Sequence, residues 1–268
     1  MIRLVCIDVD GTLVGSSGDV LPEVWSAVAA VRATGVRLAV CSGRPAFGVA
    51  REYATRLDPD GWHVFQNGAS VVHLPTARSL SQALPPDLVG ALVARARATG
   101  RTLELYTDTT YAFETANERS REHAALLGVP YAPRPFESLD GPIVRAQWLL
   151  TPDETPAVLA EPHTGLEVAP STSPIMPDTV FVNMTLAGVT KATAVRAVAG
   201  AYDVPLARVM FVGDGHNDVA AMREVGLAVA MGNAEPEVHA VAQRRVADVD
   251  DGGLAEALAL ALPSRSAA

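Results

Sequence analysis

The sequence predicts an α/β fold, a doubly wound and mostly parallel sheet that carries an inserted α+β domain. Two observations lead to this prediction. At both ends of the chain, short apolar runs alternate with helical patterns, which is typical of a parallel sheet with helices on both faces. In the middle, strand patterns follow one another without a helix between them, which indicates an antiparallel sheet.

The N-terminal part begins with a strand, a helix and a second strand. Residues 3–9 form an apolar run that ends in Asp8 and Asp10, the composition of a strand buried on both faces. Residues 22–34 show helical spacing with a proline in the first turn, and Gly35 ends the helix. The alternation continues with a strand at 36–41, a helix at 46–57 and a strand at 63–66.

The alternation breaks in the middle of the chain and then returns. The middle is predicted to hold helices at 86–99 and 117–127 and strands at 102–107, 110–114, 144–150, 166–168 and 180–186. Prolines in residues 151–177 predict loops there, with at most a short helix. The last part is predicted to hold helices at 191–202, 218–225 and 253–262, strands at 209–212 and 227–229, and a disordered tail at 263–268. We therefore expect a core domain at residues 1–83 and 187–268 and an inserted domain at residues 84–186.

Charge and composition restrict the possible partners. A formal net charge of −9 and a pI near 5.1 oppose binding to nucleic acid or anionic lipid, because the field of the protein repels polyanions. We expect no leader before Ile2, and no apolar stretch approaches the ~18–20 residues that span a bilayer. Cys6 and Cys41 lie in short apolar runs, which favours buried thiols in a reducing compartment. We expect a cytoplasmic protein without nucleic-acid or membrane partners, as a monomer or homodimer.

Polar residues follow the buried strands of the predicted core, where the reactive loops of an open parallel sheet lie. Asp8-Val9-Asp10-Gly11-Thr12 follows the first strand and Ser42-Gly43-Arg44 follows the second. Thr190-Lys191 opens the returning helix, and Gly213-Asp214-Gly215-His216-Asn217-Asp218 follows the next strand. The sequence thus predicts that carboxylates, a hydroxyl and one amine converge at this edge of the sheet.

The four aspartates, Asp8, Asp10, Asp214 and Asp218, require a cation. Carboxylates within ~4 Å of one another repel by a few kcal/mol per pair at an effective dielectric near 20. Oxygen ligands select a hard ion, and an ion that keeps waters while it bridges to a phosphate oxygen is most often Mg²⁺. The histidines do not pair at metal spacing, which disfavours zinc.

The first motif also supplies a pair of carboxylates for catalysis. Residues two apart on a strand project to one face, so Asp8 and Asp10 can address the same ligand. One can attack phosphorus while the other exchanges protons with the leaving oxygen and the hydrolytic water. Backbone amides near Gly43 and the Ser42 hydroxyl can bind phosphate oxygens, and Lys191 can neutralise the nucleophile and the transferring group together.

These segments, in this order, resemble the motifs of the haloacid dehalogenase superfamily of phosphotransferases: D-x-D-G-T, a Ser or Thr after the second strand, a Lys, and G-D-x-x-N-D. The resemblance covers the full core. The insert resembles the large α+β cap of the Cof-like branch, in which Asn67-Gly68-Ala69 also has a counterpart. The family implies a Mg²⁺-dependent phosphatase that acts on sugar phosphates and other small phosphorylated metabolites.

The resemblance also implies a role for each motif residue. Asp8 would be the nucleophile and Asp10 the acid/base and a metal ligand through its carbonyl. Asp214 would ligate the metal, and Asp218 would support it. Ser42, Lys191 and Asn217 would hold the phosphoryl group, with Gly43 and Arg44 beside them. The chain departs from the family at Ala192, where Gly is common, and in the proline-rich middle of the insert.

Other interpretations stay open at several positions. Ser42 fits a helix cap, Arg44 a surface contact, and Asn67-Gly68 either a hairpin turn or a substrate contact. A phosphomutase would use the same aspartyl-phosphate and pass it to a second hydroxyl. A receiver-like binding module would be phosphorylated on Asp8 and signal without turnover, but Asp10 argues against it because a dedicated acid/base serves hydrolysis.

Overall fold

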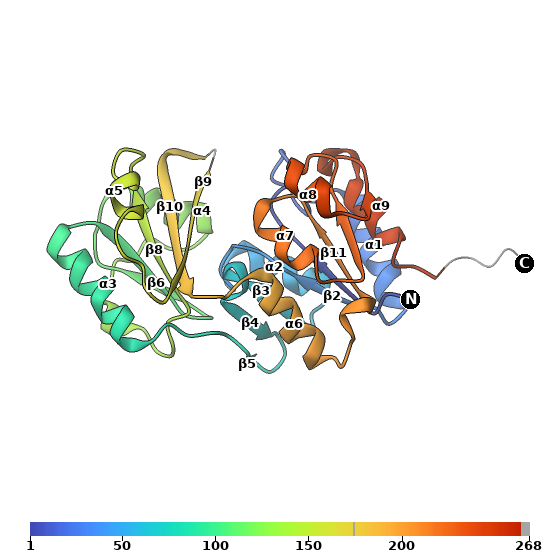
Figure 1. Cartoon of the computed structure of the whole chain (residues 1–268), viewed down its shortest axis with the longest axis horizontal. Coiled ribbons are helices and arrows are strands. Elements are labelled where there is room, and N and C mark those ends of the chain that lie inside the picture. The colour runs from blue at the N-terminus through green and yellow to red at the C-terminus, as the bar shows by residue number, and fades with distance from the viewer. Residues whose placement is uncertain (174, 264–268) are drawn as a thin grey trace, which may run out of the picture. The chain divides into compact units, whose positions relative to one another are not determined.

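A computed structural model describes residues 1–173 and 175–263, so that most of the predicted disordered tail lies outside the described residues (Figure 1). The chain divides into two compact units. The first holds residues 1–44, 50–80 and those from 190 onward, and the second holds residues 45–49 and 81–189. The boundaries expected from the sequence, after residues 83 and 186, differ from these junctions. Residues 45–49 group with the insert because Phe47 stacks on Tyr111 with ring centroids 5.8 Å apart.

The first unit is built on a parallel sheet in the strand order β13-β12-β11-β1-β2. The strands are β1 (Leu4–Ile7), β2 (Arg37–Val40), β11 (Val209–Gly213), β12 (Leu227–Ala230) and β13 (Arg244–Arg245). The chain leaves β1 for β2 on one side and returns to β11 on the other side. Such a reversal creates a crevice at the carboxyl ends of the strands, which is where open α/β sheets bind ligands.

Helices cover both faces of this sheet, which confirms the doubly wound fold (Figure 1). They are α1 (Pro22–Ala33), α2 (Val49–Leu57), α6 (Lys191–Ala201), α7 (Val219–Met222), α8 (Pro236–Val241) and α9 (Gly253–Ala259). Helices α6, α7 and α8 share one apolar core with Cys6 and Phe211 of the sheet. Helix α1 packs beside α9 on the other face (Figure 1).

A small antiparallel sheet corrects one prediction. We expected the strand at 63–66 to continue the open sheet, but β3 (Trp62–Phe65) pairs with β4 (Ser70–His73), and β4 pairs with β5 (Arg78–Ser79). A single parallel bridge between Cys41 and Val64 links β3 to β2. The chain reverses in a tight turn at Gln66–Gly68, so Asn67-Gly68 does form a hairpin turn.

The second unit is an α+β insert, as predicted. Its antiparallel sheet has the order β7-β6-β8-β10-β9, built from β6 (Thr102–Tyr106), β7 (Tyr111–Phe113), β8 (Arg145–Leu150), β9 (Leu166–Ser173) and β10 (Met176–Leu186). Its helices are α3 (Pro86–Thr99), α4 (Glu118–Leu127) and α5 (Thr155–Leu159). Side chains of α3 and α5, such as Leu92 and Val158, pack with Leu103 and Trp148 of the sheet.

The secondary structure differs from the predictions in two places, the proline-rich stretch of the insert and the C-terminal part of the chain. Residues 151–177 contain the short helix α5, but the strands β9 and β10 occupy much of the stretch expected to be loop. Pro170 lies in β9, which is an edge strand, and prolines within sheets occur mainly on edge strands. Near the C-terminus, the helix expected at 218–225 is a 3₁₀ turn at His216–Asp218 followed by α7, and α8 and β13 were not predicted.

No helix in the described ranges is long and apolar enough to cross a membrane.

Buried His63 makes the stability of this fold depend on pH. Its Nδ1 accepts from the Val40 N–H at 3.0 Å and its Nε2 donates to the Asp58 carbonyl at 2.9 Å, which fixes a neutral tautomer. Burial lowers the pKa of His63 to about 4, against 6.5 for the free side chain. Between these values the unfolded chain binds a proton that the folded chain does not, so stability falls as pH falls.

We expect His63 to contribute a loss of about 3 kcal/mol of unfolding free energy as pH falls from about 6.5 to about 4. Urea denaturation at pH 7 and at pH 4.5, for the wild type and for His63→Gln, measures this loss. The variant should be less stable at pH 7 but should show a weaker dependence on pH. Equal pH dependence in the two proteins would contradict the assignment.

Candidate active site

Asp8 directly follows the carboxyl end of β1, at the edge of the sheet where β1 and β11 end side by side. Its backbone N–H donates to the Val212 carbonyl at 3.0 Å, so the sheet ladder fixes its position. Its side chain is buried, and its Oδ1 lies 2.8 Å from Nζ of Lys191. The predicted nucleophile therefore sits on a rigid strand end and is paired with a cation.

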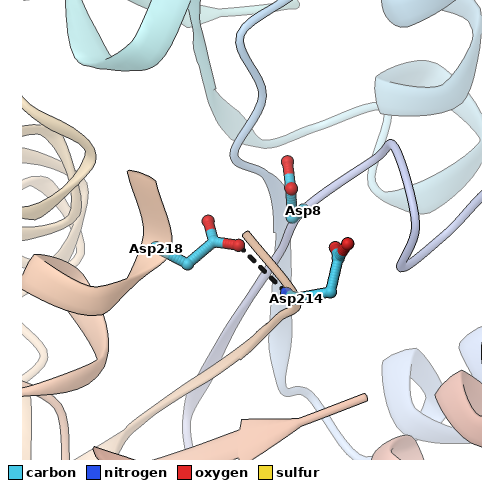
Figure 2. Close-up of side chains that lie close together, drawn as sticks. All are labelled: Asp8, Asp214 and Asp218. Carbon is cyan, nitrogen blue, oxygen red and sulfur yellow. Dashed lines mark hydrogen bonds between the residues drawn. The ribbon is translucent and has the colours of Figure 1, made fainter. Parts of the chain in front are cut away.

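Two further carboxylates converge on Asp8 (Figure 2). Asp214 follows β11 directly, and Asp218 lies one turn later in the 3₁₀ turn. One carboxylate oxygen from each of Asp8, Asp214 and Asp218 lies within 4.8 Å of the others. They meet because β1 and β11 are adjacent and parallel, with Ile7 opposite Val212, so that both strands end at the same edge.

Burial and mutual repulsion make this cluster costly without a cation. Burial raises the pKa of Asp8 well above its usual value, and the charge of Asp218 raises it further, against the lowering effect of Lys191. Burial also raises the pKa of Asp214 to about 6, although a hydrogen bond from Thr12 opposes the shift. Lys191 pairs with Asp8 and Asp218, so one ammonium group stands against three carboxylates. Their oxygen donors, close spacing and uncompensated charge fit a hard divalent cation such as Mg²⁺.

Lys191 is the only lysine of the chain, since arginines make up the other 20 of its 21 basic residues. It is buried in the first turn of α6, which Thr190 caps through a reciprocal pair of hydrogen bonds with Thr193. Burial alone would lower the pKa of Lys191, but the carboxylates of Asp218 and Asp8 outweigh it and raise the pKa above its usual value. A buried ammonium is therefore kept charged between two carboxylates.

Asp218 holds the loop of the last motif together. Its Oδ1 accepts from Nζ of Lys191 at 2.7 Å. Its Oδ2 accepts from the backbone N–H groups of Asp214 and Gly215, each at 3.1 Å, and the first of these bonds is drawn in Figure 2. Both oxygens are thus engaged, which fits the supporting role that the family resemblance implies.

The Asp10 carboxylate does not join the cluster. Its side chain is 60% exposed and pairs with the Arg44 guanidinium, whose Nε lies 3.0 Å from Oδ2. The sequence placed Asp8 and Asp10 toward one ligand because residues two apart on a strand share a face. Asp10, however, lies beyond the end of β1, so that strand alternation does not control its side chain. Asp10 is predicted to bind the metal through its backbone carbonyl. The position of its side chain does not test that prediction.

The remaining predicted residues line the same strand edge. Ser42 is buried, and its Oγ accepts from the Arg44 N–H at 3.1 Å, which shapes the turn around Gly43. Asn217 donates from Nδ2 to Oδ1 of Asn67 at 2.9 Å. His216 forms the start of the 3₁₀ turn, and no further role follows from its position.

Two residues of the site escaped the sequence analysis. Thr12 was part of the first motif without a role, and it donates from Oγ1 to Oδ1 of Asp214 at 2.7 Å. Asn233 lies outside the predicted motifs, and it donates from Nδ2 to the Gly11 carbonyl at 2.8 Å. Asn233 follows β12 at the same edge of the sheet. The rule that polar residues after the buried strands form the site therefore also applies to Asn233.

Gly11 is required where the first motif meets Asp214. Its φ is +80°, and a Cβ atom there would lie 2.1 Å from Oδ2 of Asp214. Gly18 has nearly the same φ, +78°, but open space around it. We expect Gly11→Ala and Gly18→Ala to share a backbone strain of about 1 kcal/mol, while only Gly11→Ala also displaces Asp214.

Kinetics and urea denaturation of the two glycine variants measure this difference. Gly18→Ala should keep the wild-type turnover number. Gly11→Ala should lose activity and need more Mg²⁺ for half-maximal rate. Wild-type kinetics in Gly11→Ala would show that the position of Asp214 does not matter.

The chain belongs to the haloacid dehalogenase-like hydrolases, whose family model matches residues 5–258. This match confirms the family predicted from the motifs, and with it the prediction that the chain is an enzyme, a hydrolase of that family.

Similar proteins are known in sequence and in structure. The chain is 27% identical to a Bacillus subtilis protein described as "Putative phosphatase YxeH", over 96% of this chain and 97% of that protein. A haloacid dehalogenase-like hydrolase from Bacteroides thetaiotaomicron has the same fold, with a TM-score of 0.85, 22% identity and coverage of 98% and 100% of the two chains. The subclass IIB sugar phosphatase BT4131 superimposes with a TM-score of 0.78, 23% identity and coverage of 96% and 98%.

Proposed function

We propose that this chain is a Mg²⁺-dependent phosphatase that hydrolyses phosphate monoesters of small metabolites through an aspartyl-phosphate on Asp8. The observation that carries the proposal is the buried Asp8, which lies 2.8 Å from the ammonium group of the only lysine and close to Asp214 and Asp218. The family membership and the relative described as a phosphatase support it.

Asp8, Asp214, the supporting Asp218 and the Asp10 carbonyl would hold the ion. When bound, Mg²⁺ supplies positive charge that polarises a phosphoryl oxygen and reduces repulsion between the nucleophile and the phosphate. Lys191 adds a fixed positive charge beside the Asp8 carboxylate. Together they reverse, at this one place, the negative field of a chain whose net charge is −9.

Asp8 attacks phosphorus in the first step. Lys191 holds its Oδ1, which leaves Oδ2 to form the new bond to phosphorus as the bond to the ester oxygen breaks. Asp10 gives a proton to that leaving oxygen. In the second step Asp10 takes a proton from water, the water oxygen bonds to phosphorus, and the bond from phosphorus to Asp8 breaks. The products are an alcohol and inorganic phosphate.

The loop after β2 and Asn217 bind the phosphoryl group. Ser42, the backbone near Gly43 and the Arg44 guanidinium can donate hydrogen bonds to its oxygens. Arg44 pairs with Asp10 in the structure. A phosphoryl oxygen that accepts from Arg44 instead of the Asp10 carboxylate would free Asp10 for proton transfer. This exchange would couple substrate binding to release of the acid/base.

Sugar phosphates or phosphorylated cofactors are the substrates we propose, since a structurally similar protein is a sugar phosphatase. The buried free thiols of Cys6 and Cys41 support a reducing, cytoplasmic location. We propose a monomer or a homodimer.

Release of phosphate from p-nitrophenyl phosphate, with Mg²⁺ and with EDTA, tests the proposal. We expect turnover with Mg²⁺ and none with EDTA. A panel of sugar phosphates, nucleotides and phosphorylated cofactors then identifies the substrate class. An isomeric sugar phosphate instead of free phosphate would favour a phosphomutase, and a long-lived phosphoprotein without turnover would favour a receiver-like module.

A further inference from the structure

The turn between β3 and β4 adopts an unfavourable backbone conformation beside the proposed site. Gln66 and Asn67 are consecutive non-glycine residues with φ of 54° and 55°. A left-handed conformation costs a non-glycine residue about 1–2 kcal/mol, and asparagine tolerates it better than most residues. The rest of the fold must therefore hold this turn in place.

Backbone contacts tie this turn to two of the motif loops. The N–H of Gln66 donates to the Arg44 carbonyl at 2.9 Å, and the N–H of Asn67 donates to the Ser42 carbonyl at 3.0 Å. Gly68 lies against the start of α6, where a Cβ atom would be 2.2 Å from the Thr190 carbonyl oxygen. The turn is thus packed between the loop that binds phosphoryl oxygens and the helix that carries Lys191.

The Asn67 side chain reaches the third motif loop. Its Oδ1 accepts from Nδ2 of Asn217 at 2.9 Å. Its carboxamide also covers Gly43, where a Cβ atom would lie 3.2 Å from the same oxygen. A single side chain therefore joins the loop after β2 to the loop after β11.

We propose that Asn67 is a positioning residue that acts through Asn217; this proposal rests on the proposed function. By accepting one N–H of the Asn217 carboxamide, Asn67 fixes the plane of that group and directs its second N–H to the phosphoryl group. Asparagine suits the position because it tolerates the left-handed backbone and offers a neutral acceptor. A carboxylate there would repel phosphate.

The variant Asn67→Gly tests the proposal, because glycine adopts the left-handed backbone without strain and removes only the side chain. Asp203→Gly is the matched control. Asp203 has φ 51° and follows the far end of α6 (Lys191–Ala201), whose first turn carries Lys191. We expect Asn67→Gly to lower kcat/KM for p-nitrophenyl phosphate about tenfold, the effect of losing one oriented hydrogen bond. Asp203→Gly should leave kcat/KM unchanged.

A double-mutant cycle with Asn217→Ala separates positioning from a structural role. If Asn67 acts through Asn217, then Asn67→Gly has no further effect in the Asn217→Ala background. The affinity for inorganic phosphate in the presence of Mg²⁺, measured by calorimetry, should follow the same pattern. Additive losses in the cycle, or wild-type kinetics and phosphate affinity in folded Asn67→Gly, would overturn the proposal.

Failure of the proposed function gives a different result. A wild type that binds phosphate without hydrolysing any ester would refute the phosphatase, while the phosphate affinities of the four proteins in the cycle would still decide the role of Asn67. A wild type that neither binds phosphate nor hydrolyses an ester would overturn both.

Discussion

Asp8→Asn should abolish hydrolysis of p-nitrophenyl phosphate, with kcat reduced by at least about 10⁴-fold. The asparagine side chain keeps the volume and the place of Asp8 at the end of β1. It cannot form an acyl phosphate, because its amide is not a nucleophile at neutral pH. Steady-state kinetics at saturating Mg²⁺ measure the loss, and circular dichroism checks that the variant is folded.

The exposed Asp19 of the same unit supplies the matched control for this change. Asp19→Asn removes the same charge from the chain without touching the cluster, so it should keep wild-type kinetics. Mass spectrometry of acid-quenched wild type should detect a phosphorylated protein that Asp8→Asn lacks. Turnover of Asp8→Asn within tenfold of the wild type would show that another group attacks phosphorus.

Lys191→Met should lose both activity and stability. Methionine replaces the aliphatic part of the side chain but leaves the buried Asp8 and Asp218 without their shared ammonium group. Removing one partner of a buried ion pair costs about 3–5 kcal/mol, and the transferring phosphoryl group loses a fixed charge. Urea denaturation without Mg²⁺ should show a loss of that size, and kcat should fall about 10³-fold.

Arg196→Met is the control for Lys191→Met, because Arg196 lies on the same helix in an exposed pair with Glu224. Exposed pairs contribute about 0–1 kcal/mol, so this variant should be close to wild type. The single lysine of the chain also allows a direct observation, since lysine labelled with ¹⁵N at Nζ gives one ammonium signal. That signal should persist without titrating between pH 6 and 9. Equal stability of the two methionine variants would contradict the role of Lys191 as a buried counterion.

Elements with marked ends were predictable from the sequence. Helix α3 was predicted at its observed bounds, because a proline in its first turn and Gly100 after its last residue mark both ends. Strands β1 and β11 were found because buried parallel strands form continuous apolar runs. Short elements such as β5 and β13 could not be predicted, since two residues carry no periodicity.

Interactions between distant segments were less predictable than the motifs. The sequence placed Asp8, Asp214 and Asp218 at one edge because strand order and the switch point determine where strand ends meet. It could not place the Asp10 side chain, which is turned to Arg44, 34 residues away, by a contact between two loops. Likewise, Asn-Gly predicted the turn at Asn67, but the bond from Asn217 joins residues 150 apart and leaves no local pattern.

Calorimetric titration of Mg²⁺ into the metal-free protein tests most directly whether this acidic cluster is a cation site. We predict one site per chain in the wild type and a strong loss of affinity in Asp214→Asn, whose side chain keeps the shape but loses the charge. Absence of Mg²⁺ binding to the wild type, or equal affinity in both proteins, would contradict the account.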